Sequence, residues 1–238
     1  MTLVVFLVTI FATMAIGVPV AFALMFCGIV LMQWLGIFNA SILSQQMIQG
    51  ANTFTLLAIP FFLLAGELMN AGGLSRRIVD FAIACVGHLR GGLGVVAIIA
   101  AVIMASLSGS AAADTAALAA ILIPMMRQAG YNVPRAAGLM AAGGIIAPVI
   151  PPSIAFIIFG VAANVSITGL FLGGIVPGLL MAVTLLATWL VVARKENVAP
   201  LPRVPLRGRL EATRRAAWAL VMPVIVLGGI RLGVFTPT

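Results

Sequence analysis

GGLGVVAIIAAVIMASLSGSAAADTAALAAILIPMM, residues 91–126, consists of two apolar arms joined by a polar centre. The centre, SLSGSAAADTAA at 106–117, holds three serines, a glycine, an aspartate and a threonine. Each arm has about fifteen residues and reaches about 22–24 Å, which is short of a hydrocarbon core of about 30 Å. Arg90 and Arg127 flank the two outer ends. The stretch therefore predicts a re-entrant hairpin, although two full spans would satisfy the same charge pattern.

The whole chain has the composition of a helical membrane protein. Of its 238 residues, 63% are hydrophobic and 8% are charged, and the mean hydropathy is +1.25. The apolar runs are continuous, which excludes a water-soluble core and favours spanning helices over strands with alternating polarity. We predict an all-α polytopic membrane protein, a helical bundle with apolar segments at 3–16, 18–35, 54–70, 92–107, 111–126, 136–163, 168–192 and 216–235.

The basic residues predict how the chain is oriented in the membrane. A net charge of +8 would suggest nucleic-acid binding in a soluble protein, but in a membrane protein the placement of the charges matters more. All arginines and the lysine except Arg231 can lie on one side. By the positive-inside rule that side is the cytoplasm. We therefore expect a multi-pass protein of a bacterial cytoplasmic (inner) membrane, in contact with the lipid bilayer and without a nucleic-acid partner.

The N-terminal region leaves one alternative open. Residues 3–35 form either two short spans interrupted at GVP, 17–19, or one long tilted helix. The choice decides the side on which the N-terminus lies. The uncharged stretch 36–53 is expected as an external loop.

Two charged segments are expected at the membrane surface. SRRIVDFAIACVGHL, 75–89, predicts a surface helix. Arg76 or Arg77 can pair there with Asp80 at helical spacing. Residues 193–215, rich in proline and arginine, predict a cytoplasmic linker that leads into a basic interfacial helix.

The polar centre of the hairpin has the features of a binding site. Non-helical backbone exposed to lipid would leave costly unpaired groups, so the centre must line protein or a cavity. Ser108 or Ser110 is a plausible N-cap for the second arm, whose amides would point into the membrane. Asp114 is either functional or only complements this helix N-terminus. The candidate residues in the hairpin are Ser106, Ser108, Gly109, Ser110, Asp114 and Thr115.

A second interruption follows in GGIIAPVIPPS, 143–153. Each proline removes the amide that would pair with the carbonyl four residues earlier. This frees the carbonyls of Gly144, Ala147 and Pro148, and predicts an unwound helix rather than a simple proline kink. Its candidate residues are Gly143, Gly144, Ala147, Pro148 and Pro151. An oxygen cage suited to sodium is expected from Ser108, Ser110, Gly144, Ala147 and Pro148.

Several motifs, in order along the chain, resemble one transporter family. They are GVPVAFAL from 17, LLAIPFFLLAGELMNAGGLSRRIVD at 56–80, SLSGSAAADTAA from 106, GYNVPRAAGL from 130, GGIIAPVIPPSI from 143 and GVFTPT from 233. The chain is similar to the large permease subunit, DctM type, of the tripartite ATP-independent periplasmic (TRAP) transporters.

The resemblance implies a sodium-driven importer of organic acids. Its expected partners are a small four-helix membrane subunit and a periplasmic substrate-binding protein. The fold it implies has inverted repeats that move as an elevator, and the hairpin with the broken helix would form one sodium site and half of the substrate site. On this view residues 1–192 form the first repeat, with the hairpin at about 92–126 and the broken helix at about 136–163. Residues 193–215 are the linker, and 216–238 begin a second repeat that is missing here.

Three other functions are alternatives to the permease. A membrane serine hydrolase needs a base near Ser108 or Ser110, and the sole histidine, His88, is expected at the interface, so we expect no enzyme. An ion channel with a re-entrant pore loop is less consistent with a broken helix. A sodium-coupled organic-anion carrier that needs no binding protein is the nearest alternative. Sodium is expected as the coupling ion, without any other cofactor.

Overall fold

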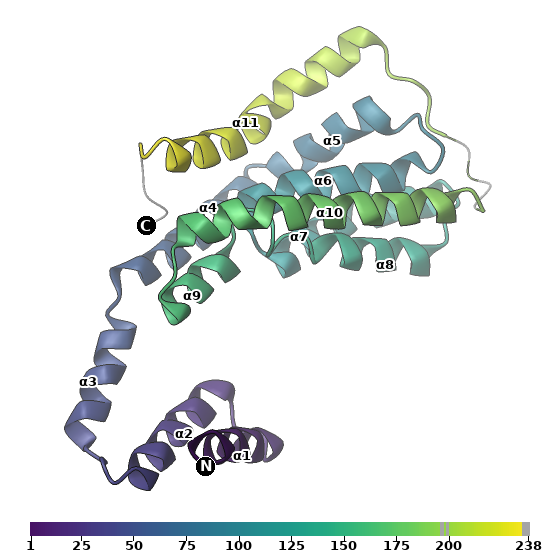
Figure 1. Cartoon of the computed structure of the whole chain (residues 1–238). Coiled ribbons are helices and arrows are strands. Elements are labelled where there is room, and N and C mark those ends of the chain that lie inside the picture. Colours follow the sequence, from purple (N-terminus) through teal and green to yellow (C-terminus); the bar gives the residue numbers. More distant parts are fainter. Residues whose placement is uncertain (196–197, 199, 235–238) are drawn as a thin grey trace. The chain divides into compact units, whose positions relative to one another are not determined.

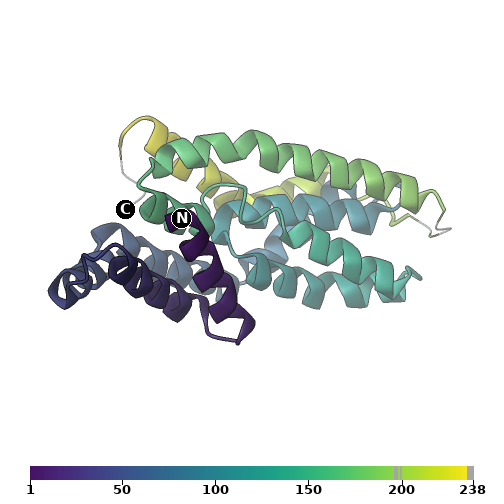
Figure 2. The ribbon, with the colours of Figure 1, turned by 60° about the horizontal axis from the view of Figure 1, so that its bottom comes forward.

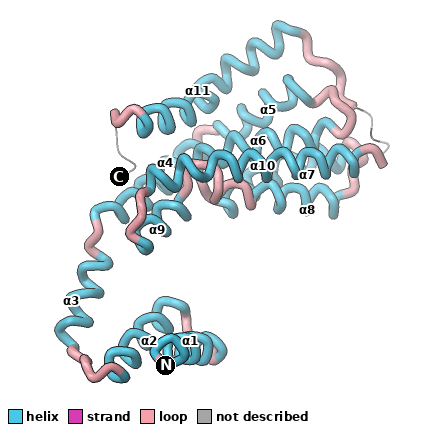
Figure 3. The backbone as a smooth tube through the Cα atoms, viewed as in Figure 1, coloured by secondary structure: helices cyan, strands magenta, loops and turns pink. Residues whose placement is uncertain are grey.

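The structure is a computed structural model that describes residues 1–195, 198 and 200–234. By its internal contacts the chain divides into two compact units, Met1–Thr53 and Phe54–Thr238. Every regular element in the described residues is helical, as Figure 3 shows by its cyan and pink tube. The predicted all-α class is therefore confirmed. The division into transporter repeats stays a prediction.

The first unit contains three helices: α1 (Thr2–Ala15), α2 (Val20–Trp34) and α3 (Ala40–Ala51). Gly17 at φ +87° ends the first helix, and Pro19 precedes the second, so the chain turns between them. Two short helices are therefore present rather than one long helix. The stretch 36–53, expected as an external loop, contains the helix α3 behind the N-cap Asn39, whose Oδ1 accepts a hydrogen bond from the Ser41 amide at 2.9 Å. Its external position stays a prediction.

The second unit begins with a short 3₁₀ turn and continues through eight α-helices in the described residues. They are η1 (Phe54–Leu57), α4 (Ala58–Ala71), α5 (Leu74–Val86), α6 (Gly92–Ser108), α7 (Ala111–Gln128), α8 (Val133–Gly144), α9 (Ile154–Ala163), α10 (Ile167–Ala193) and α11 (Leu206–Arg231). Figure 1 labels them, and Figure 2 shows the pair α7 and α8, in teal, from a second direction.

Helix α6 is the centre of this unit. Fourteen of its seventeen residues are buried, because α5, α7, α8 and α10 pack around it. The sequence permits this burial since α6 is apolar on every side, which is typical of a helix enclosed by other helices. Against it, α7 buries a single stripe at four-residue spacing, made by Asp114, Leu118, Leu122 and Met126. Asp114 thus begins the face of α7 that points into the core.

The start of α6 is fixed by a tryptophan from the far end of α10. The indole Nε1 of Trp189 donates a hydrogen bond of 2.9 Å to the carbonyl oxygen of Gly91. A side chain at Gly94 would overlap the same indole. The indole also stacks on Tyr131, with ring centroids 6.2 Å apart. This arrangement, the Trp189 clamp, joins the bases of α6, α8 and α10.

Two stretches in the described residues are long and apolar enough to cross a membrane: Phe54–Ala71 and Ile167–Ala193. They match the predicted segments 54–70 and 168–192. Four shorter apolar helices, α1, α2, α6 and α9, accompany them. The predicted segment 136–163 is divided into α8 and α9, so an interruption is present where the prolines indicated one.

The basic segment near the C-terminus differs from the expectation in one respect. Residues 206–215 and the apolar residues that follow them form the single helix α11, rather than an interfacial helix and a separate span. Arginine is a good helix former, so the change in polarity does not interrupt the backbone. The segment 196–197 and residue 199 of the predicted linker, and the motif residues 235–238, lie outside the described residues.

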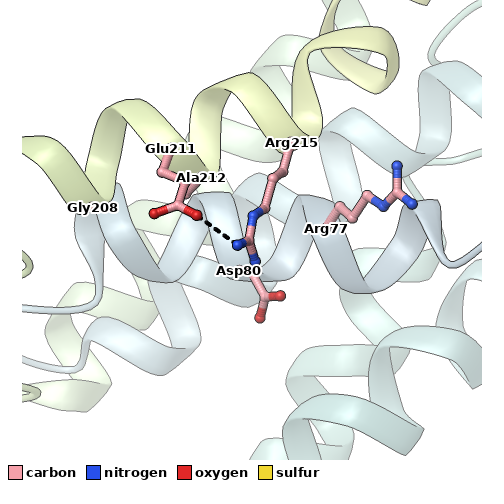
Figure 4. Close-up of a pocket in the computed structure, with 6 residues that line it drawn as sticks. All are labelled: Arg77, Asp80, Gly208, Glu211, Ala212 and Arg215. Atoms are coloured by element: carbon pink, nitrogen blue, oxygen red, sulfur yellow. Dashed lines mark hydrogen bonds and ion pairs between the residues drawn. The ribbon is translucent and has the colours of Figure 1, made fainter.

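Helices α5 and α11 pack side by side and enclose a groove of about 530 Å³. Figure 4 shows its charged lining and the 2.5 Å ion pair between Glu211 and Arg215. The predicted pairing of Asp80 was wrong: Arg77 points away from it in Figure 4, and no ion pair to Asp80 exists in the described residues. Both members of the observed pair are more than 60% exposed, so it contributes little stability.

Candidate functional site

The turn between α6 and α7 is built by a glycine and a capping serine. Gly109 ends α6 with φ +58°, a left-handed conformation that side chains disfavour. Ser110 then precedes α7, and its Oγ accepts a hydrogen bond of 3.4 Å from the amide of Ala113. The predicted N-cap is therefore confirmed at Ser110. We call residues 106–110 the hairpin tip.

Ser108 and Asp114 are bonded to each other inside the hairpin. The hydroxyl of Ser108 donates to Asp114 Oδ1 at 2.5 Å, and it accepts a hydrogen bond of 3.2 Å from the Ser110 amide. Asp114 is 1% exposed, and its second oxygen, Oδ2, has no hydrogen-bond partner in the described residues. The carboxylate therefore fixes the hydroxyl of the tip and keeps one unpaired oxygen in the interior.

The second interruption, residues 145–152, is a series of turns between α8 and α9, drawn in pink in Figure 3. The carbonyl of Gly144 accepts a hydrogen bond from the Ala147 amide at 3.1 Å. The carbonyl of Pro148 accepts one from Ser153 Oγ at 2.6 Å. We call this segment the helix break.

These bonds correct one expectation from the sequence. Of the three carbonyls predicted to be free, only that of Ala147 lacks a hydrogen bond in the described structure. The prolines do remove the helical donors, but a tight turn and a serine hydroxyl replace two of them. A carbonyl oxygen has two lone pairs, so Gly144 and Pro148 each keep one for another partner.

The hairpin tip and the helix break lie against each other. A methyl group placed on Gly109 would lie 2.7 Å from the carbonyl oxygen of Pro152 and 3.0 Å from Cα of Ser153. A methyl group on Gly144 would collide with the hydroxyl of Thr115 and lie 3.2 Å from the carbonyl oxygen of Ala111. Glycine at both positions lets the backbones approach. The end of α6, the start of α7, the end of α8 and the start of α9 consequently meet at one place.

The remaining predicted residues lie around this meeting point. Ala147 packs in a small apolar cluster with Ala105 and Ala182, and Gly143 faces Ala101. Ser106 and Pro151 line an apolar cavity of about 250 Å³ toward α10 and α11. The hydroxyl of Ser106 donates to the carbonyl of Ile103 at 2.6 Å, so it is paired within its own helix.

Asp114 and Thr115 point to different sides of α7, because adjacent residues on a helix are separated by about 100°. Thr115 contacts α8 at Gly144. Ser108 and Asp114 instead line a small void with residues of α4 and α5. The structure thus brings most of the predicted residues together at the helix break, but it places the acidic side chain on the opposite face of the hairpin.

Sequence reasoning missed residues on both faces. Ser153, fully buried, holds the Pro148 carbonyl, and its place directly after two prolines and before a helix was a usable signal. Gly66, Asn70 and Ser75 lie beside Asp114, some forty residues away in sequence. Local patterns carry no information about such contacts.

The chemistry of this region is that of an oxygen-lined ion or solute site. Its groups are serine and threonine hydroxyls, backbone carbonyls and one carboxylate. In the part of the chain that the structure describes, no cluster of three or more His, Cys, Asp or Glu side chains is present to hold a metal ion. Oxygen ligands on broken helices suit a hard cation, and helix N-termini suit an anion.

A broken helix packed on a polar hairpin is an arrangement found in secondary transporters. The family model described as "Tripartite ATP-independent periplasmic transporter, DctM component" matches residues 7–238. The chain belongs to this family of TRAP transporter large permease proteins.

Relatives support the assignment over the length of the chain. The 2,3-diketo-L-gulonate TRAP transporter large permease protein of Escherichia coli is 55% identical over 238 residues, which is 100% of this chain and 56% of the relative. The C4-dicarboxylate large permease of Pseudomonas aeruginosa is 44% identical over 196 residues, 82% of this chain and 46% of its own length. The sialic acid large permease of Vibrio cholerae is 41% identical over 222 residues, 93% of this chain and 52% of its own.

The chain spans about half the length of the curated relatives it matches. These relatives are named as transporter permeases. A location in a membrane follows from the family and from the apolar helices.

Proposed function

We propose that this chain is part of a sodium-driven permease that imports carboxylate-bearing solutes. The observation that carries the proposal is the meeting of four helix ends at the hairpin tip and the helix break. The starts of α7 and α9 offer amides to a carboxylate, and the ends of α6 and α8 offer carbonyl oxygens to a cation. An anion and a cation bound side by side would stabilise each other in a low-dielectric environment.

The proposed sodium ligands are those predicted from the sequence: Ser108, Ser110, and the carbonyls of Gly144, Ala147 and Pro148. The Ser108 hydroxyl is bonded to Asp114 on the opposite face of the hairpin, so it would have to turn toward the helix break to bind the ion. The close approach at Gly144 and Gly109 supports this set, because it brings the hairpin tip within contact of the helix break. The carbonyl of Ala147 has no other partner in the described structure, and those of Gly144 and Pro148 each have a second lone pair.

We also propose that the hairpin is re-entrant. Its arms have 17 and 18 residues and reach about 26 and 27 Å, so they are longer than the sequence indicated but still shorter than a core of about 30 Å. Neither arm is among the candidate spans in the described residues. An elevator motion of this region is the mechanism that the family resemblance implies.

The tripartite character of the family supports the two proposed partners, a small four-helix membrane subunit and a periplasmic binding protein. The solute class is supported by the relatives, whose names carry 2,3-diketo-L-gulonate, C4-dicarboxylate and sialic acid. All three are carboxylates, so the shared chemistry is an anionic organic acid.

The test is solute uptake into proteoliposomes. They contain the full permease of which this chain is part, together with the small membrane subunit. The sodium gradient and the binding protein are varied independently, with the three labelled acids as probes. Uptake that requires both supports the proposal. Uptake that requires sodium alone indicates the carrier without a binding protein, and sodium flux without solute indicates a channel.

Site variants make the test specific. Ser108→Ala and Gly144→Ala should raise the sodium concentration needed for half-maximal uptake more than they reduce the amount of protein in the membrane. Gly138→Ala is the matched control, because a methyl group there meets no atom within 4 Å. Unchanged sodium activation in both site variants would overturn the proposed cage.

A further inference from the structure

Ser153 stands at the N-cap position of α9, but its side chain does not cap that helix. Its backbone is extended, at φ −130° and ψ 131°, and its hydroxyl makes no hydrogen bond to the first amides of α9. A serine at this position usually accepts such a bond. The hydroxyl of Ser153 instead donates to the Pro148 carbonyl, five residues earlier, at 2.6 Å. The side chain therefore serves the helix break rather than the helix that it precedes.

The other serine and asparagine N-caps in the described residues act in the usual way. Each accepts a hydrogen bond from an amide in the first turn of its own helix; they are Asn39, Ser110, Asn132 and Ser166. Ser153 also differs from these four in its burial, because it is 0% exposed and none of them is buried. A helix start without a side-chain cap is less stable. The stability of α9 consequently does not explain where this hydroxyl points.

The bond to Pro148 replaces a backbone bond that the sequence removes. In a continuous helix the Pro148 carbonyl would accept from the amide of residue 152, but Pro152 has no amide hydrogen. The Ser153 hydroxyl is the one described donor to that carbonyl. Because Ser153 is fully buried, bulk water does not replace it. The direction of the Pro148 carbonyl thus depends on a single side chain.

Ser153 also lies where the helix break touches the hairpin tip. A methyl group placed on Gly109 would lie 3.0 Å from Cα of Ser153. The backbone of Ser153 therefore packs against the tip, while its hydroxyl holds a carbonyl of the break. A ligand group that is already fixed in one direction loses less freedom on binding than a group that must first be ordered. This position suits a residue that orients a ligand of the ion without touching the ion itself.

We infer that Ser153 is a positioning residue of the proposed sodium site. Its hydroxyl occupies one lone pair of the Pro148 carbonyl and directs the other lone pair toward the bound ion. The inference rests on the proposed function, because the Pro148 carbonyl is one of the proposed sodium ligands. Loss of the donor should weaken sodium binding and leave the KM for the solute at saturating sodium unchanged.

The experiment follows the melting of the purified full permease as sodium replaces choline. An ion that binds only the folded protein raises the melting temperature with its concentration, and the rise gives a dissociation constant. Ser153→Ala removes the donor, and Ser153→Cys keeps a weak one. We expect the dissociation constant for sodium to increase roughly three- to tenfold in Ser153→Ala, the effect of one hydrogen bond, and by less in Ser153→Cys. An unchanged or lower constant in both variants would overturn the inference.

Ser166→Ala is the matched control for the loss of a serine hydroxyl near a helix start. Ser166 is exposed and caps α10, where its Oγ accepts a hydrogen bond of 3.2 Å from the Gly169 amide. Its replacement should lower the melting temperature in choline without changing the dissociation constant for sodium. If Ser153→Ala behaves in the same way, its role is only structural and the inference fails.

Uptake into proteoliposomes separates the failure of this inference from the failure of the proposed function. If neither the uptake nor the melting of the wild type responds to sodium, the proposed function fails and the inference fails with it. If the wild type responds and both Ser153 variants keep its half-saturating sodium concentration, the inference alone fails. A rise in the KM for the solute at saturating sodium, without a change in sodium activation, would assign Ser153 to the solute and would also overturn the inference.

Discussion

The hairpin tip and the helix break interrupt two helices in different ways. The tip is a short turn with one glycine at positive φ, a serine cap and a serine–aspartate hydrogen bond. The break is longer and contains three prolines. It is held by backbone hydrogen bonds of its turns and by one side-chain bond, from the Ser153 hydroxyl to the Pro148 carbonyl. The tip is therefore closed by its own serines and by Asp114 in the first turn of α7, whereas the only side-chain bond described at the break comes from Ser153 directly after it.

The difference indicates which segment is the more rigid partner. Side-chain bonds that involve a charged group are stronger than neutral ones and are costly to lose in the interior. The tip has such a bond, and the break does not in the described residues. We therefore expect the tip to keep its shape while the break adjusts to a bound ion.

The largest effect is expected where the two segments touch. Gly109→Val should prevent stable folding, because a β-branched residue disfavours φ +58° and its side chain would overlap the Pro152 carbonyl. The measurement is the melting temperature and the yield of the purified permease. Gly130→Val is the matched control, since Gly130 has φ +86° and nothing within 4 Å. Equal losses in both variants would show that contact with the break is unimportant.

The next comparison removes one hydroxyl from each segment. Ser108→Ala leaves the Asp114 carboxylate without its donor and should cost about 1.5–3 kcal/mol. Ser153→Ala leaves only the neutral Pro148 carbonyl unpaired and should cost nearer 1 kcal/mol. Ser44→Ala, on an exposed face of α3, serves as a control for the serine change itself. A larger loss for Ser153→Ala would reverse the assignment of rigidity. Denaturation of the purified variants gives the three values.

A smaller effect is expected from packing between α7 and α8. Gly144→Ala should destabilise by about 1–2 kcal/mol because the new methyl group meets the Thr115 hydroxyl. Thr115→Ala in the same chain should restore part of the loss. Melting temperatures of the single and double variants form the cycle, with Gly138→Ala as reference. Purely additive losses would show that the two side chains are not in contact.

The smallest effect concerns the Trp189 clamp at the base of the hairpin. Trp189→Phe keeps an aromatic ring but removes the hydrogen bond to the Gly91 carbonyl, at a cost of about 1 kcal/mol. Trp218→Phe is the control, because Trp218 is 76% exposed. Melting temperature and sodium-dependent uptake are measured together. A change in sodium activation would show that the shape of the tip depends on its base.

Local chemistry made the two interruptions predictable. The cap at Ser110 and the break around Pro148 and Pro151 follow from rules that act over a few residues. The partners of the freed carbonyls were less accessible, because a turn and the Ser153 hydroxyl compete for them. A cluster of polar residues in the sequence therefore indicates where hydrogen-bonding groups gather. It does not indicate which of these groups stay unpaired.

Long-range placement was not predictable from one sequence. The hydrophobic stripe of α7 already put Asp114 on the same face as Leu118 and Leu122, but nothing local indicated which helix covers that face. The partners in the void come from α4 and α5. The same limit applies to α11, where a change from basic to apolar residues suggested a boundary that the continuous backbone does not have.

The Trp189 clamp also constrains the order in which the protein is made. Trp189 and Gly91 are 98 residues apart, and the indole fills the space beside Gly94 at the start of α6. The base of the hairpin can be closed only after α10 has left the ribosome and entered the bilayer. Until then the hairpin arms are present without their clamp, so the nascent chain must keep the turn at 106–110 between them through about eighty further residues of synthesis.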